Sequence, residues 1–283
     1  MKKIRGRIAE VGTPARYSLS RNRKTWGSRH YNRLTVSSRK RKAPTLGDAK
    51  RAANALRRAF PRIDGVFLYG SVARGDADQW SDIDLIITGS GPDITPQRLR
   101  QTLSRHGVDR ISLIYYPTSV FRRHYRERAL FIAHLKKEGV ALYDRLGLLQ
   151  TVLRKPFVPI IDVSEGIRSH LTKLAPYADP MRFNNNFLFC LAHVYSIGKG
   201  VIMLGLAHRG VLEFNREAAF RRFVALNPDL KKEIGRVTRL RPFYNLVTGR
   251  HPEQLPFSYK SASRQLRDAV TAVRRLAESA EVL

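Results

Sequence analysis

Two aspartates separated by a single residue are the side chains of this chain best suited to metal binding and catalysis. Asp82 and Asp84 flank Ile83 and are followed by the apolar run Leu85-Ile86-Ile87. In a β-strand, residues i and i+2 point to the same face, so the two carboxylates are expected to converge. Clustered carboxylate oxygens suit Mg2+, which usually takes one or two carboxylates together with substrate phosphates. The spacing therefore predicts a metal site that handles a nucleoside triphosphate.

A glycine–serine pair, Gly70-Ser71, precedes these aspartates, and the ten residues from Val72 to Ser81 separate it from Asp82. This arrangement resembles the signature of the nucleotidyltransferase superfamily that includes DNA polymerase β. The sequence Ser-Asp-Ile-Asp-Leu is most similar to the corresponding motif of the minimal bacterial nucleotidyltransferases and the antibiotic adenylyltransferases. The alternative is a buried edge strand that carries two aspartates by chance. Charges within Ile-Asp-Leu-Ile-Ile are costly to bury without a cation or another partner, which favours the metal site.

The resemblance implies nucleotidyl transfer, in which an acceptor hydroxyl attacks the α-phosphorus of the triphosphate and pyrophosphate leaves. Asp82 and Asp84 would then be catalytic metal ligands for Mg2+. Ser71 and the backbone N–H groups after Gly70 would bind the β- and γ-phosphates, because N–H groups at a turn attract anions. Arg74 is either a further phosphate ligand or an exposed arginine. ATP is the nucleotide we expect first.

The superfamily normally supplies a third carboxylate from a later strand, and this chain departs from that pattern. The matching frame is Ile111-Ser112-Leu113, which has a serine in place of the acid. Asp109 lies three residues earlier and becomes the third catalytic acid only if a bulge re-aims it. A glutamate of the later helical region, Glu165 or Glu213, is the other candidate for deprotonating the acceptor.

A second resemblance rests on spacing alone. Arg128 and His134 satisfy the Arg-x5-His spacing of the HEPN ribonucleases, which often accompany minimal nucleotidyltransferases. Both residues fall inside an expected helix of the first domain. A surface arginine and a partly buried histidine are the simpler interpretation there.

The elements that must position these residues follow from periodicity and from Gly and Pro breaks. In the first part we expect helices near 45–60, 95–106 and 119–137, and strands at 63–69, 82–88, 108–116 and 140–143. In the second part we expect helices near 164–176, 182–207, 214–226, 228–240 and 261–281, with a loop at 248–258. The predicted fold class is α+β, with a small mixed-sheet nucleotidyltransferase core followed by an all-helical domain.

The expected domain organisation has four parts. Residues 1–43 are predicted to be a basic disordered tail, since they hold fourteen Lys or Arg against one acid and few periodic apolar residues. Residues 44–145 form the nucleotidyltransferase domain, 146–161 a linker, and 162–283 a helical acceptor-binding domain. An Arg-rich, acid-poor tail also resembles an organellar transit peptide, which is the alternative interpretation of residues 1–43.

The net charge of the chain limits the kinds of partner that we expect it to bind. The formal net charge is +29, which favours association with polyanions. No apolar run approaches the roughly 20 residues that span a bilayer, so no membrane segment is expected. The single cysteine, Cys190, excludes an internal disulfide. It is compatible with the cytoplasm, where we expect the protein to reside.

Two function classes remain open. The first is a metal-dependent nucleotidyltransferase that moves an NMP, AMP being expected first, onto RNA or a partner protein. Residues 162–283 hold nineteen Lys or Arg against eleven acids, so a polycationic antibiotic is a poorer acceptor than a macromolecule, unless a local acidic pocket exists. The second class is a non-catalytic nucleotide or nucleic-acid binder with a degenerate site, which Ser112 favours.

Overall fold

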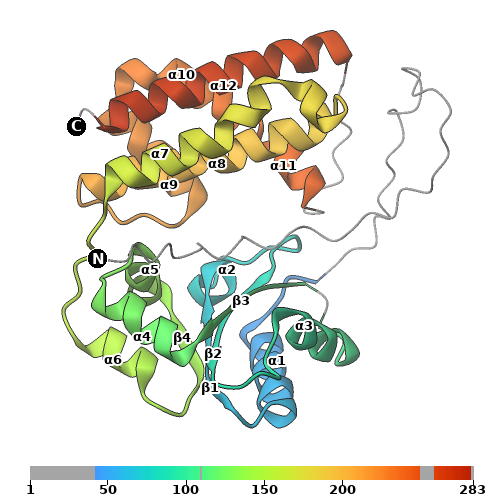
Figure 1. The fold of residues 1–283 in the computed structure, drawn as a ribbon, viewed down its shortest axis with the longest axis vertical. Helices are drawn as coiled ribbons and strands as arrows, with labels where there is room; N and C mark the ends of the chain where they lie inside the picture. The colour runs from blue at the N-terminus through green and yellow to red at the C-terminus, as the bar shows by residue number, and fades with distance from the viewer. Residues whose placement is uncertain (1–41, 109, 249–257, 282–283) are drawn as a thin grey trace, which may run out of the picture.

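The computed structural model describes residues 42–108, 110–248 and 258–281. The chain has a sheet half, residues 46–154, and a helical half, residues 163–281 (Figure 1). This mixed sheet followed by helices confirms the predicted fold class. Residues 1–41 of the predicted tail, which spans 1–43, lie outside the described residues. Asp109 lies outside them as well.

A four-stranded mixed sheet forms the centre of the sheet half, in the order β3-β2-β1-β4. The strands are β1 (Ile63–Tyr69), β2 (Ile83–Gly89), β3 (Ile111–Pro117) and β4 (Val140–Asp144). Strand β1 pairs antiparallel with both β2 and β4, whereas β2 and β3 are parallel. All residues of β1 except Tyr69 are buried, as expected for a central strand covered on both faces.

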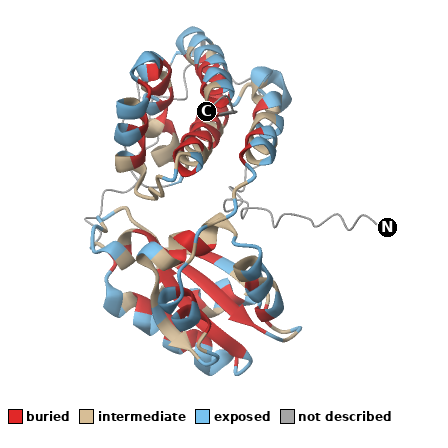
Figure 2. Cartoon of the chain, turned by 90° about the vertical axis from the view of Figure 1, so that its left-hand side faces the viewer, coloured by how far each residue is buried: buried red, intermediate tan, exposed pale blue. Residues whose placement is uncertain are grey.

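Helices cover both faces of this sheet. The bounds are α1 (Leu46–Ala59), α2 (Gly70–Arg74), α3 (Pro96–Arg105), α4 (Thr118–Arg126), α5 (Leu130–Glu138) and α6 (Leu148–Arg154). Buried residues of α1 and α3, such as Leu56 and Leu99, pack on one face of the sheet. Those of α4, α5 and α6 pack on the other face around Phe67. Figure 2 colours buried residues red, and much of the sheet is red beneath its helices. The glycine–serine turn that opens α2 therefore sits at the end of a strand that is held from both sides.

The structure corrects two predictions in the sheet half. The single helix expected at 119–137 is two helices, since Arg128 adopts a left-handed φ of 53° between α4 and α5. This break frees the carbonyl of Arg128 to accept a hydrogen bond of 2.9 Å from the N–H of Ile160. The segment predicted as a linker, 146–161, contains α6, whose Leu149 is fully buried in the sheet half.

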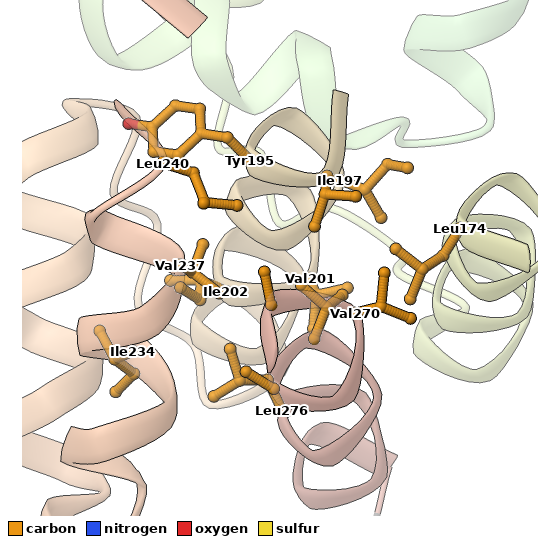
Figure 3. Close-up of a cluster of buried hydrophobic side chains, with 14 of the residues drawn as sticks. Leu174, Tyr195, Ile197, Val201, Ile202, Ile234, Val237, Leu240, Val270 and Leu276 are labelled. Carbon is orange, nitrogen blue, oxygen red and sulfur yellow. The ribbon is translucent and has the colours of Figure 1, made fainter. Parts of the chain in front are cut away.

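The helical half is built around α8. Its elements are α7 (Val163–Leu174), η1 (Ala175–Ala178), η2 (Pro180–Phe183), α8 (Phe187–His208), α9 (Arg216–Leu226), η3 (Pro228–Leu230), α10 (Lys231–Thr238), α11 (Arg241–Val247) and α12 (Tyr259–Glu281). Side chains of α8 such as Val201 pack against α10, α12 and α7 in one apolar core (Figure 3). Helix α11 lies between the helices predicted near 228–240 and 261–281, where the sequence predicts none. Pro242 occupies the first turn of α11, where its missing N–H costs nothing.

Helix α8 is relevant to the expectation that the chain has no membrane segment, because it is long and apolar. By length and composition it could cross a membrane, since it has 22 residues and its most apolar window has a mean hydropathy of 1.7. Over half of that window, 56%, is buried inside the helical half. The same apolar residues thus serve as the centre of a protein core.

Candidate active site

Gly70 forms the turn between β1 and the short helix α2. Its φ is +75°, a left-handed conformation that glycine adopts without the steric cost borne by other residues. A Cβ atom at this position would lie 2.3 Å from Oδ2 of Asp84. The structure thus places the Asp84 carboxylate directly against the turn, in a space that only a glycine leaves open.

The two aspartates lie at the start of β2. Asp84 pairs with Tyr69 in the antiparallel register, and Asp82 stands immediately before Ile83, the first residue of β2. Both are partly buried. In the described residues no three His, Cys, Asp or Glu side chains gather into a metal site. A pair of carboxylates fits Mg2+, provided that phosphate oxygens complete its coordination.

Ser112 occupies the position beside Asp84 on β3. The parallel register pairs Asp84 with Ser112, so Tyr69, Asp84 and Ser112 form one row across three strands. Burial, and next the charge of Asp84, raise the pKa of Tyr69, while a hydrogen bond to Ser112 opposes this rise. The phenol therefore keeps its proton. The row has hydroxyl groups beside Asp84, at the position where the superfamily pattern has a third acid.

The two other predicted nucleotide-binding residues, Ser71 and Arg74, lie in α2. Ser71 is partly buried, and its carbonyl accepts a hydrogen bond from the N–H of Asp76. Arg74 donates from Nη1 to Glu138 at 2.8 Å and from Nε to Asp76 at 3.2 Å. Its guanidinium is thus held by two carboxylates, an arrangement that the sequence did not indicate.

Glu138, the last residue of α5, is a site residue that sequence reasoning missed. Its side chain is only 5% exposed, and Oε1 accepts from the Gly70 N–H at 3.0 Å. It also contacts Arg74 and Nε2 of His134. Burial alone would raise the pKa of Glu138, but His134 and then Arg74 outweigh it and hold the pKa at about 2. The carboxylate is therefore a fixed anion behind the turn.

His134 extends this network toward the helical half. Its ring meets the edge of Tyr69 at 5.2 Å between centroids and stacks on Phe214 at 4.1 Å. Phe214 belongs to the segment that joins α8 to α9, whereas His134 lies on α5. The Arg-x5-His spacing of Arg128 and His134 is unrelated to these contacts, because Arg128 lies in the break between α4 and α5.

The two glutamates that are candidates for deprotonating the acceptor lie in different surroundings. Glu213 precedes Phe214 and is 11% exposed, with Lys137 at 3.7 Å and Arg222 at 3.5 Å. Glu165 is 63% exposed in the first turn of α7 and pairs with Arg168. Glu213 therefore lies in the segment that contacts the sheet half, and Glu165 does not take part in the contacts described above.

A cationic cluster on α8, α9 and α11 is a second feature that the sequence did not reveal. Lys199 and Arg216 lie over the ring of Tyr244 at 5.9 and 5.8 Å. Nη1 of Arg216 and Nε of Arg241 are buried and lack a hydrogen-bond partner within the described parts of the chain. Such nitrogen atoms can receive an anionic group.

Residues 49–167 match the family model described as a nucleotidyltransferase domain. No curated protein sequence matches. Spectinomycin adenyltransferase AAD(9) from Enterococcus faecialis, solved with ATP and spectinomycin, is 11% identical, with a TM-score of 0.49 over 82% of this chain and 100% of that one.

Two further solved structures are more distant in shape. A nucleotidyltransferase-like protein from Exiguobacterium sibiricum is 14% identical, with a TM-score of 0.33, covering 81% of this chain and 74% of that one. A toxin–antitoxin structure with AMP-PNP is 18% identical, with a TM-score of 0.29, covering 37% and 80%. The family match spans β1, the α2 turn and β2, which carry the predicted signature. Residues 49–167 are therefore similar to a nucleotidyltransferase domain, in agreement with the resemblance carried by the glycine–serine turn and the paired aspartates.

Proposed function

We propose that the protein transfers an NMP, AMP first among them, from a nucleoside triphosphate to a macromolecular acceptor. The observation that supports this proposal is the close approach of Asp84 to Gly70, which puts one carboxylate of the predicted pair beside the predicted phosphate-binding turn. Asp82 and Asp84 would hold Mg2+, because carboxylate oxygens are donors that this ion accepts. When bound, the ion neutralises charge on the phosphates.

The chain's own residues position the reactants in this proposal. Ser71 and the N–H groups of α2 bind the terminal phosphates, and Gly70 lets the backbone approach them. Glu213 is the acceptor base we favour over Glu165, because it is largely buried beside the contact between the two halves. It is paired with Lys137 and Arg222 in this structure.

The acceptor is proposed to be RNA or a protein with an anionic surface. Lys199, Arg216 and Arg241 supply positive charge in the helical half, although Arg241 also pairs with Glu217 at 2.7 Å. The two buried nitrogen atoms that lack a hydrogen-bond partner among the described residues suit phosphate or carboxylate oxygens. A polycationic antibiotic meets like charge at this cluster. The cluster therefore supports a polyanionic acceptor.

Transfer can be tested by incubating the full chain with α-labelled ATP, CTP, GTP or UTP, Mg2+ and cell extract. We expect label on RNA or protein with the wild type and none with Asp84→Asn. Asp229→Asn, which changes an exposed aspartate of η3, is the matched control and should transfer like the wild type. Absence of label with every triphosphate would contradict the proposal.

A non-catalytic nucleotide binder is the second candidate, and Ser112 is the observation that favours it. The residue beside Asp84 on β3 carries no charge, so the described site has one carboxylate fewer than the superfamily pattern. Triphosphate binding that requires Asp84, without transfer to any acceptor, would establish this alternative.

A further inference from the structure

The segment 212–215 of the helical half contacts both α5 and the loop that follows α2. Phe214 stacks on His134 with the ring planes 15° apart, and Asn215 donates from Nδ2 to Asp76 at 3.0 Å. Lys137 adds a hydrogen bond of 2.6 Å to the carbonyl of Leu212. The segment is therefore attached to α5 and to Asp76, which follows α2.

These contacts form a closed chain of interactions, here called the ring of contacts, that passes through the sheet half. From Asn215 the path runs through Asp76 to Arg74, then through Glu138 to His134, and returns to Phe214. Both ends of α2 lie on this ring, because Glu138 also accepts the N–H of Gly70. The ring begins and ends on the same four residues of the helical half.

The turn depends on such external support. Helix α2 has only five residues, too few for its own hydrogen bonds to hold it in a fixed place. The Gly70 N–H at its start has no partner within a helix, and Glu138 supplies one. Arg74 at its end is tied by charge-assisted hydrogen bonds, which are stronger than neutral ones.

We propose that Glu138 and His134 are positioning residues through which segment 212–215 of the helical half holds the phosphate-binding turn in its working geometry. The inference rests on the proposed nucleotidyl transfer. It means that the acceptor-binding half sets the geometry of the triphosphate site. Neither residue touches the reacting atoms. Displacing the turn by about 1 Å would be enough to lower transfer about a hundredfold.

Two glutamate variants test the first step of this proposal. Glu138→Ala removes the partner of Gly70 and Arg74, and Glu138→Gln keeps an acceptor for the Gly70 N–H. We expect the dissociation constant for the Mg2+–triphosphate complex to rise at least tenfold in Glu138→Ala, with partial recovery in Glu138→Gln. Hydrogen exchange in peptides covering residues 69–75 should accelerate in the same order. Glu127→Gln, at an exposed glutamate of the sheet half, should change neither.

The second step is tested from the helical half. Phe214→Leu removes the ring that stacks on His134, and Phe157→Leu removes a comparable ring that stacks on Tyr125, outside the ring of contacts. We expect faster exchange at 69–75 and a three- to tenfold weaker triphosphate complex only in Phe214→Leu. The combination of Phe214→Leu with Glu138→Gln should be non-additive, since both act through one chain of contacts.

The outcomes separate this inference from the proposed function. A wild type that binds triphosphate, together with a folded Phe214→Leu variant whose exchange at 69–75 is unchanged, overturns the inference alone. Glu138 variants with a lower melting temperature but an unchanged dissociation constant also overturn it, because they show only a structural role. A wild type that binds no triphosphate overturns both.

Discussion

Asp84 lies between Tyr69 and Ser112 in a single cross-strand row, with Ser112 paired to it in the parallel register of β2 and β3. The residue beside this predicted metal ligand is thus a serine whose hydroxyl interacts with a buried phenol. In this row the number of carboxylates, and hence the number of divalent cations the site can hold, depends on one side chain. A substitution at Ser112 therefore reports directly on the metal site.

Ser112→Asp is expected to create a carboxylate pair across β2 and β3. Like charges opposite each other should lower the free energy of unfolding by about 0.5–1 kcal/mol without a divalent cation. Mg2+ should reverse this loss, because it binds between the two carboxylates, and transfer should rise. Thermal unfolding with and without Mg2+, together with a transfer assay, measures both effects.

The control for this variant is Ser90→Asp, which adds the same charge at an exposed residue just beyond β2. Its unfolding should not respond to Mg2+. If Ser112→Asp and Ser90→Asp respond to Mg2+ alike, the aspartate added at Ser112 does not face Asp84.

Gly70→Ala tests the contact that carries the proposed function. An alanine there combines left-handed strain with a Cβ 2.3 Å from Oδ2 of Asp84. Gly75→Ala is a matched control, since Gly75 has a similar φ of +80° but nothing within 4 Å of an added Cβ. The control should lose about 1–2 kcal/mol of unfolding free energy from strain alone. Gly70→Ala should lose more, as measured by chemical denaturation, and should also lose triphosphate binding. Equal effects in both variants would mean that Asp84 does not depend on the turn.

The stability of the protein should depend on pH through Glu138. Its pKa of about 2 in the folded chain is below the ordinary value of 4.5. The contribution of this carboxylate is therefore complete above about pH 4.5 and is lost as the pH falls toward 2. At pH 7 we expect Glu138→Gln to lower the free energy of unfolding by about 2 kcal/mol. The gap between wild type and variant should narrow below pH 4.5, and a gap that is constant from pH 7 to 3 would contradict this assignment.

The sequence predicted those parts of the site that follow from local pattern. Strand β1, the glycine at the turn and the start of β2 are neighbours in the chain, and alternation with a glycine–serine pair defines them within about twenty residues. The frame that points to Ser112 agrees with the register, which pairs this residue with Asp84. Whether these residues bind metal or nucleotide remains a prediction.

The parts that sequence reasoning missed depend on contacts between distant residues. Glu138 and Gly70 are 68 positions apart, and Phe214 and His134 belong to different halves of the chain. Nothing in Lys136-Lys137-Glu138 distinguishes a site carboxylate from a surface one. The break between α4 and α5 contains neither glycine nor proline, so the helical pattern continues through it. These features follow from packing, which a pattern along the chain does not encode.

Removal of residues 1–43 tests the role of the basic N-terminal sequence. It deletes fourteen Lys or Arg against one acid, and for every phosphate that is no longer neutralised the slope of log affinity against log salt should become shallower by about 0.9. We expect weaker nucleic-acid binding with a flatter salt dependence, measured by fluorescence anisotropy with labelled RNA between about 50 and 200 mM salt. Triphosphate binding should be preserved, because the turn and both aspartates lie after residue 43. An unchanged salt slope would place the nucleic-acid contacts on the folded halves, with the cluster of Lys199, Arg216 and Arg241 as the next region to substitute.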